Sequence, residues 1–294
     1  MITHCDTVDA AVREIFDPSV RVVGRQGTSG GCINETACLR LSNNEQLFLK
    51  VNSARFRGMF LAEAKGLLAL DQEGGPRVPS PLACHEGENE QFILLSYIPS
   101  GRPNHHHYRD FGHAFATLHQ KRSSEVFGFH HDNYIGSTPQ RNANCDRWIP
   151  FFRDHRLGFQ IDLAARKGLA SGALVKKVER LMSKLEGLID EPTHPSILHG
   201  DLWTGNAMAD EDGNAVIFDP AAYYGHYEAD LAMTELFGRF PPDFYAAYRE
   251  VLPLDGEYRS SRMTIYNLYH ILNHLNIFGP SYAGQAMSMV SRFV

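Results

Sequence analysis

The stretch Ile197-Leu-His-Gly-Asp-Leu-Trp-Thr-Gly-Asn206, followed further along by Val216-Ile-Phe-Asp219, decides the fold of this chain. Between the two segments Asp212 is followed directly by a glycine, and an Asp-Gly pair between apolar runs is a strong signal for a tight hairpin turn. Asn206 lies six residues before Asp212, and Asp219 lies six residues after that glycine. An antiparallel hairpin would therefore bring Asn206 and Asp219 to its open end.

The loop that leads into this hairpin carries another carboxylate, Asp201. Two carboxylates and an amide at a common mouth can coordinate Mg²⁺ through oxygen and leave one carboxylate as a general base. For either aspartate taken alone, an ordinary Asx turn is the better interpretation. The spacing of Asp201 and Asn206, the symmetry of the hairpin and a lysine–glutamate pair upstream together favour a phosphate-binding site.

The upstream pair begins with a lysine inside an apolar strand. Gln46-Leu-Phe-Leu-Lys-Val51 predicts a strand in which Lys50 is surrounded by apolar residues, where an unpaired ammonium is costly. Helical periodicity over 58–70 places Glu63 on the apolar stripe of the next element. We expect Lys50 to pair with Glu63, as in kinases that hold the α and β phosphates of ATP. The alternative is that Lys50 reaches solvent at the strand end while Glu63 faces water.

A glycine-rich segment, Gly24 to Asn34, lies between two predicted strands before Lys50. Its glycines let backbone amides approach an anion, so the segment is similar to the phosphate-covering hairpin of kinases, with Gly30, Gly31 and Cys32 as candidate nucleotide contacts. A flexible turn in a β-meander is an equally good interpretation of this segment alone. Because nearby amides lower a thiol's pKa, a redox-linked dimer through Cys32 is a hypothesis beside a monomer.

Composition excludes several classes of protein. The 294 residues are 43% hydrophobic and 21% charged, which is typical of a globular chain that forms one large domain or two modest lobes. The net charge of −6 and the lack of a long Lys/Arg run argue against nucleic-acid binding. Five scattered cysteines without a C-x-x-C pair favour a reducing compartment. Without a signal peptide or a membrane-length apolar stretch, the sequence predicts a soluble cytoplasmic protein with no membrane partner.

Proline and glycine punctuation divides the chain into two predicted lobes. Residues 1–96 form the expected nucleotide-binding lobe, 97–103 a hinge, and 104–294 a helical lobe with the catalytic loop and acceptor site. Backbone groups of Ser96, Tyr97 and Ile98 are candidates for contacting adenine.

The helical lobe also offers candidate acceptor residues. Asn133, Tyr134 and Gln140 lie in segments rich in amide and aromatic side chains that suit a polar, sugar-like ligand. A packed surface loop is at least as good an interpretation of those segments. Asp230 lies in the first turn of a predicted helix, where a carboxylate is favoured by the helix dipole. It could equally accept backbone amides of the catalytic loop.

Several further motifs resemble the fructosamine kinase (ketosamine-3-kinase) family, whose members are related to the aminoglycoside and choline kinases. Beside the kinase elements above, the likeness rests on Gly30-Gly-Cys-Ile-Asn34, Phe127-Gly-Phe129, Asn133-Tyr-Ile-Gly136, Thr138-Pro-Gln140, Phe151-Phe152 with Arg156-Leu157, and Tyr224-Gly-His226. The resemblance spans nearly the whole chain. It implies an α+β, two-lobed protein-kinase-like fold, with a small antiparallel-sheet N-lobe carrying one main helix and a larger, mostly helical C-lobe.

The resemblance also implies cofactors and roles. ATP and Mg²⁺ would be the cofactors, and Asp201 would be the base that accepts the proton of the sugar hydroxyl. Lys50 would bind phosphates and Glu63 would position it. Asn206 and Asp219 would hold Mg²⁺, and residues 96–98 would form the ATP hinge.

The function implied is phosphorylation of the 3-hydroxyl of a ketosamine, a ribulosamine or fructosamine on an amine or a protein lysine, as a deglycation step. Trp203 and His226 are added to the acceptor candidates. One alternative is a kinase of the same fold that acts on an aminoglycoside or amino alcohol. A non-catalytic nucleotide-binding regulator is a second alternative, which the complete set of kinase residues disfavours.

Overall fold

The computed structural model describes residues 2–28 and 34–294, and its first part is built on a six-stranded sheet of order β1-β5-β6-β4-β3-β2. Only the pairing of β1 with β5 is parallel. The sequence did not predict β1 or β5. The bounds of the strands are β1 Thr3–His4, β2 Val22–Gly27, β3 Glu35–Leu41, β4 Gln46–Ser53, β5 Pro81–Glu86 and β6 Glu90–Ser96.

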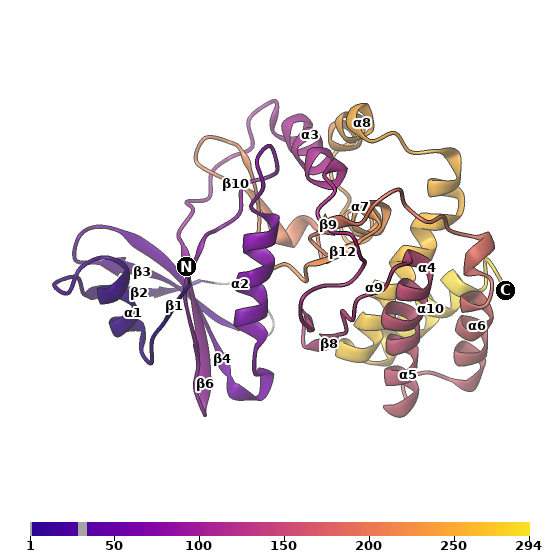
Figure 1. Ribbon diagram of the computed structural model, residues 1–294, viewed down its shortest axis with the longest axis horizontal. Coiled ribbons are helices and arrows are strands. Elements are labelled where there is room, and N and C mark those ends of the chain that lie inside the picture. Colours follow the sequence, from indigo (N-terminus) through magenta and orange to yellow (C-terminus); the bar gives the residue numbers. More distant parts are fainter. Residues whose placement is uncertain (1, 29–33) are drawn as a thin grey trace.

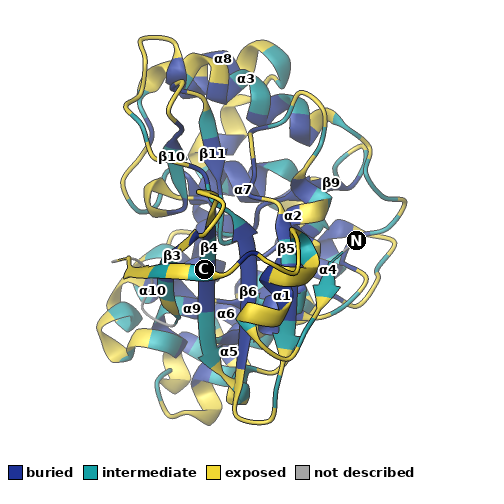
Figure 2. Ribbon diagram, turned by 90° about the vertical axis from the view of Figure 1, so that its left-hand side faces the viewer, coloured by how far each residue is buried: buried dark blue, intermediate teal, exposed yellow. Residues whose placement is uncertain are grey.

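Strand β4 separates two layers of core. Its alternate residues Leu47 and Leu49 are buried in a small core with α1 (Val8–Ile15). Phe48 packs against the main core, and Lys50 is buried on the same side of the strand as Phe48. Helix α2 (Met59–Leu70) packs on β5 and β6, and its buried stripe joins the main core. Figure 2 shows the buried centre of the sheet around β4 and β6, with the outer surface of α1 exposed.

The rest of the chain is mainly helical and lies beyond α2 from the sheet (Figure 1). Its α-helices are α3 His107–Gln120, α4 Trp148–Phe151, α5 Phe159–Arg166, α6 Gly172–Met182, α7 Tyr227–Met233, α8 Pro242–Val251, α9 Met263–Phe278 and α10 Ala283–Val290. Phe152–Gly158 and Tyr258–Arg262 are π-helical, and short 3₁₀ turns occur at Ala54–Phe56, Leu185–Gly187, Thr204–Asn206 and Pro280–Tyr282. The expected α+β, two-lobed kinase-like architecture is confirmed.

Three two-stranded sheets shape the inner side of the helical part. They are β7 Asn133–Ile135 with β8 Thr138–Gln140, β9 Ser196–Leu198 with β12 Tyr223–Gly225, and β10 Ala207–Ala209 with β11 Ala215–Ile217. The last pair is the predicted hairpin. It is antiparallel with Ala207 opposite Ile217, and the amide of Phe218 donates to the carbonyl of Asn206 at 3.1 Å. The predicted open end, with Asn206 and Asp219 at its mouth, therefore exists.

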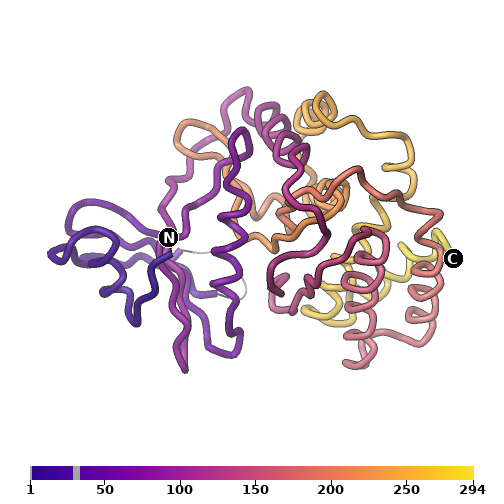
Figure 3. Tube along the Cα trace, in the orientation of Figure 1, coloured from indigo at the N-terminus to yellow at the C-terminus, as the bar shows by residue number. Residues whose placement is uncertain are grey.

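Segments from the first part of the chain lie on both sides of this hairpin, as the trace in Figure 3 shows. Arg77 pairs with Val216, and Ser100 pairs with Asp210. The Arg77 guanidinium also contacts the buried Asp210 carboxylate at 2.8 Å. Across the described residues, no helix is long and apolar enough to cross a membrane.

Candidate active site

The predicted lysine–glutamate pair forms, and it includes a third member. The side chain of Lys50 is 3% exposed, and its Nζ lies 2.6 Å from Glu63 Oε1 of helix α2. The same ammonium contacts a carboxylate oxygen of Asp219, just beyond the hairpin. Burial opposes the charge on Lys50, but the two carboxylates outweigh it and raise the pKa of this lysine above its ordinary value. Lys50 thus connects the sheet, helix α2 and the hairpin mouth.

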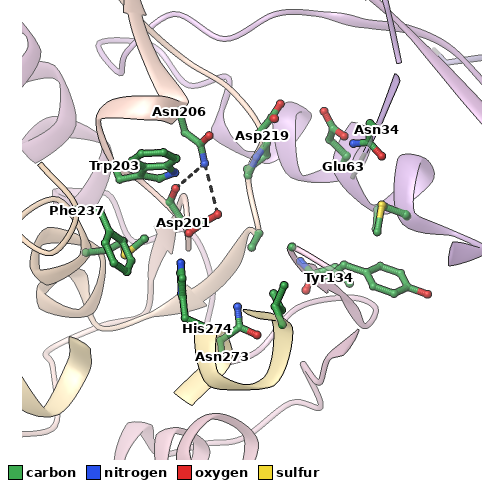
Figure 4. A pocket seen from close by; sticks show the side chains of 18 of the residues that line it. Asn34, Glu63, Tyr134, Asp201, Trp203, Asn206, Asp219, Phe237, Asn273 and His274 are labelled. Carbon is green, nitrogen blue, oxygen red and sulfur yellow. Dashed lines mark hydrogen bonds between the residues drawn. The ribbon is translucent and has the colours of Figure 1, made fainter. Parts of the chain in front are cut away.

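Asp201 lies across the mouth from this trio, as the close view in Figure 4 shows. The amide nitrogen of Asn206 donates to the Asp201 carbonyl at 2.8 Å and faces its carboxylate at 3.4 Å. Burial and the negative charges of Asp219 and Asp230 raise the pKa of Asp201 well above its usual range. A carboxylate whose pKa is raised by burial and by neighbouring charge is a candidate for proton transfer.

Asp230 holds the loop that carries Asp201. This buried residue of α7 accepts hydrogen bonds from the backbone amides of His199 at 2.6 Å and Gly200 at 2.9 Å. Its third partner is the ring nitrogen Nε2 of His119, at 3.2 Å. Burial alone would raise the pKa of Asp230, but the hydrogen bond with His119 and neighbouring charges lower it, which keeps the residue an acceptor. The loop-bracing interpretation of Asp230 is therefore the correct one.

Two backbone conformations shape this mouth. Gly200 has φ +80°, and a Cβ there would lie 2.2 Å from the carbonyl oxygen of Ala221, so the loop requires glycine. Asp219 has φ +58°, a left-handed conformation that aspartate tolerates better than most residues. Strained backbone of this kind is frequent where a side chain is held for function.

The donor set fits a cation that is shared with a nucleotide. Asn206 donates a hydrogen bond from its amide nitrogen to Asp201, so its side-chain oxygen remains available to a metal in the cavity that Asp219 also lines. Among residues 2–28 and 34–294, no group of three or more His, Cys, Asp or Glu could hold a metal ion. Mg²⁺ is commonly held by one or two protein ligands together with substrate phosphates, so this sparse set suits it.

One cavity of about 470 Å³ is lined by Lys50, Glu63, Asp201, Asn206 and Asp219. Of the predicted acceptor residues, Asn133, Tyr134 and Trp203 also line it. Gln140 and His226 are absent from its described lining, because both are buried in supporting positions. Gln140 donates to the Asn133 side chain at 2.8 Å, and His226 accepts the Glu228 amide at 3.2 Å as the N-cap of α7.

Other predicted nucleotide contacts lie outside the described lining of this cavity. Ser96 ends β6, and its hydroxyl accepts the amide of Ser80 at 2.8 Å. Tyr97 and Ile98 follow where the chain leaves the sheet, with Ile98 buried. Gly30, Gly31 and Cys32 lie outside the described residues, so the predictions made for them stay predictions.

Sequence reasoning missed the far wall of the cavity. That wall is contributed by the segment after α7 and by α9 and its C-terminal continuation, with the residues Phe237, Asn273, His274, Ile277, Phe278 and Tyr282. Helix α9 is buried over most of its length, but its last turns also face the cavity. The available signal was a histidine and a phenylalanine four residues apart at the end of an otherwise buried helix.

The fructosamine kinase family model matches residues 5–294. The chain belongs to the fructosamine kinase family. It is 40% identical to a protein named "Probable ketoamine kinase" from Synechocystis sp., over 97% of this chain and 95% of that one. It is 37% identical to a chloroplastic protein-ribulosamine 3-kinase of Oryza sativa subsp. indica, over 94% of this chain and 80% of that one.

Solved structures place this family member among kinase-like folds. A candidate fructosamine-3-kinase of Haemophilus somnus superposes with a TM-score of 0.87 at 28% identity, covering 97% of this chain and 96% of that one. A macrolide 2'-phosphotransferase of Brachybacterium faecium superposes with a TM-score of 0.60 at 16% identity, covering 96% and 97%. The second likeness concerns the fold alone.

Proposed function

We propose that this protein transfers the γ-phosphoryl group of ATP to the 3-hydroxyl of a ketosamine, a ribulosamine or fructosamine on an amine. The observation that carries the proposal is the meeting of Lys50, Asp201, Asn206 and Asp219 in one cavity. Family membership supports it, since similar proteins are named ketoamine kinase and protein-ribulosamine 3-kinase.

The nucleotide side of the cavity is the sheet side. Lys50, held by Glu63, is placed to contact phosphate oxygens, and the charge it supplies stabilises the transferring group. Asn206 and Asp219 would hold Mg²⁺, which neutralises phosphate charge when bound. Residues 97–103 serve as the hinge between a lobe of residues 1–96 and a lobe of 104–294, with adenine at Ser96, Tyr97 and Ile98.

The acceptor side lies across Asp201. In this proposal its carboxylate accepts the proton of the sugar hydroxyl as that oxygen attacks phosphorus, and Asn206 orients it through the 3.4 Å contact. Asp230 acts indirectly in this proposal. It accepts hydrogen bonds from the loop amides and contacts neither the acceptor nor the phosphate. Asn133, Tyr134 and Trp203 are placed to contact the sugar.

An acceptor panel tests the proposal. Purified protein with ATP and Mg²⁺ is given a ribulosamine, a fructosamine, an aminoglycoside and an amino alcohol, with ADP release and the phosphate position by NMR as readouts. We expect phosphate on O3 of a ketosamine. Preferential transfer to the aminoglycoside or amino alcohol would establish the other kinase activity, and ATP binding without acceptor-dependent ADP release would indicate a regulator.

A further inference from the structure

A continuous aromatic surface borders the acceptor side of the cavity. We call it the aromatic wall and define it as Phe237, His274, Phe278 and Tyr282. The ring of His274 lies 4.5 Å from that of Phe237 and 5.2 Å from those of Phe278 and Tyr282, measured between centroids. The rings of Phe278 and Tyr282 are 6.2 Å apart. Four rings from three parts of the chain thus share one face.

One ring of the wall, that of Phe278, is exposed, and the other three are half-buried. Among the described residues, five large hydrophobic side chains are exposed, and two of them, Trp203 and Phe278, line this cavity. Phe278 is 52% exposed although it ends a helix whose other aromatic residues are buried. Apolar surface held open at a site of chemistry is typical of ligand contact.

The charges around the wall favour a cation. The described lining of the cavity contains three carboxylates, Glu63, Asp201 and Asp219, against the single ammonium of Lys50. His274 adds no positive charge, because burial lowers its pKa. Its Nδ1 lies 2.8 Å from the His270 carbonyl and must carry the proton, so Nε2 is a lone-pair acceptor. A positive group on the wall would meet π faces and lone pairs only.

The chemistry of a ketosamine places a positive group there. Its nitrogen is bonded to C1 and is separated from O3 by four single bonds, so the two atoms are at most ~5 Å apart. A secondary alkylamine is protonated at neutral pH. Figure 4 shows Asp201 between Asp219 on one side and Phe237 and His274 on the other. With O3 at Asp201, the side away from Asp219 directs the nitrogen toward the wall, which lines the same cavity.

We propose that the aromatic wall is the subsite for the amine carrier, where Phe278 and Tyr282 bind the protonated nitrogen and the first methylenes of an alkyl amine such as a lysine side chain. This inference rests on the proposed function for the placement of O3. The exposed ring of Phe278 lies where the carrier continues toward solvent. The wall therefore selects for the amine, while Asp201 selects for the hydroxyl.

The test uses a matched pair of ligands, the 1-butylamino and 1-butoxy derivatives of 1-deoxyribulose, which differ in charge and share their length. Calorimetry with a non-hydrolysable ATP analogue gives the dissociation constant of each for wild type, Phe278→Leu, Tyr282→Leu and Phe278→Tyr. Phe16→Leu makes the same substitution at an exposed phenylalanine outside the cavity lining and is the control. Separate turnover assays record phosphorylation.

We expect wild type to prefer the amine over the ether. Phe278→Leu and Tyr282→Leu should each reduce this preference roughly 2- to 30-fold, with the dissociation constant for nucleotide unchanged. Phe278→Tyr and Phe16→Leu should retain it. An unchanged preference in both leucine variants, or equal binding of amine and ether by wild type, would overturn the subsite. If wild type binds the amine selectively without phosphorylating it, the proposed function fails and the subsite stands.

Discussion

At the residue scale, the two aspartates at the open end of the hairpin, Asp201 and Asp219, differ in their surroundings. Asp219 is paired with the Lys50 ammonium, whereas the partner of the Asp201 carboxylate among the described residues is the neutral side-chain amide of Asn206. Burial and the charges of other carboxylates raise the pKa of Asp201. In the proposed function, these different surroundings favour Asp219 as the cation ligand and Asp201 as the proton acceptor, although the side chains are the same.

Replacing Asp201 tests this assignment. Asp201→Asn keeps the size of the side chain and removes the proton acceptor, so we expect kcat to fall roughly 10²- to 10⁴-fold. ATP should still bind, because Lys50 and Asp219 are unchanged. Stopped assays of ADP release and a nucleotide-binding titration measure the two effects, with the exposed Asp162→Asn of α5 as the control. Near-normal turnover in Asp201→Asn would eliminate it as the base.

At the scale of elements, the loop that carries Asp201 is positioned by a helix that follows it in the chain. Asp230 of α7 receives two loop amides, and behind it His119 of α3 bonds the hydroxyl of Tyr248 at 2.8 Å. Helix α3 and the loop after β9 thereby meet at the carboxylate of Asp230, and α8 is joined to them through His119. This buried network holds the loop from outside.

Asp230→Asn should therefore lower kcat. An amide directed at the two loop N–H groups leaves a donor or an acceptor unsatisfied, which costs about 1–3 kcal/mol of unfolding free energy. We expect kcat to fall with little change in KM for ATP, because the Lys50 side of the site is not touched. Steady-state kinetics and chemical denaturation measure both, with the exposed Asp243→Asn of α8 as the reference. A rise in KM for ATP alone would contradict the loop-bracing role.

The segment around Gly101 packs closely against the hairpin β10–β11. The amide of Gly101 donates to the Ala209 carbonyl at 2.8 Å, and a Cβ on Gly101 would lie 2.1 Å from the Asp210 carbonyl oxygen. Gly101→Ala should lower the unfolding free energy by about 1–3 kcal/mol and raise KM for ATP, because the segment must move off the hairpin. Gly187→Ala, where a Cβ meets open space, is the matched control. Equal melting temperatures for the two variants would refute this.

How far the sequence predicted these elements depended on distance along the chain. The hairpin and the Lys50–Glu63 pair follow from local spacing and from the cost of burying a charge, so both could be predicted. Residue type alone does not say which way a polar side chain faces, and so Gln140 and His226 were placed among acceptor residues although they support others. The aromatic wall was missed because it forms only when α9 packs against α7, which brings Phe237 beside His274.

At the scale of the whole molecule, buried neutral histidines couple stability to pH. Burial lowers the pKa of His226 and of His270 from 6.5 to about 3. The unfolded chain binds these protons below pH 6.5 and the folded protein does not. Stability is therefore fully present above pH 6.5 and is lost as pH falls toward 3.

His226→Asn isolates one of these contributions. Asparagine can still cap α7 but does not titrate, so the variant should lose less stability on acidification than wild type. Between pH 6.5 and 4.5 the difference should grow by about 1.4 kcal/mol for each pH unit. Urea unfolding across that range measures it, and His4→Asn, near the N-terminus, is the control. Parallel pH curves for wild type and His226→Asn would exclude His226 as a source of acid sensitivity.

The contact of Lys50 with both Glu63 and Asp219 also bears on the order in which ligands enter. A divalent ion that binds Asp219 without a nucleotide must displace Lys50 from that carboxylate. The buried ammonium of Lys50 is then paired with Glu63 alone. When phosphates arrive together with the ion, they replace Asp219 as the partner of Lys50, and every charge keeps a counterpart. In the proposed function, metal and nucleotide affinities are therefore linked through one side chain, and we expect each ligand to strengthen the binding of the other. We expect the empty protein to bind a free divalent ion weakly, because that ion alone would break the Lys50–Asp219 pair.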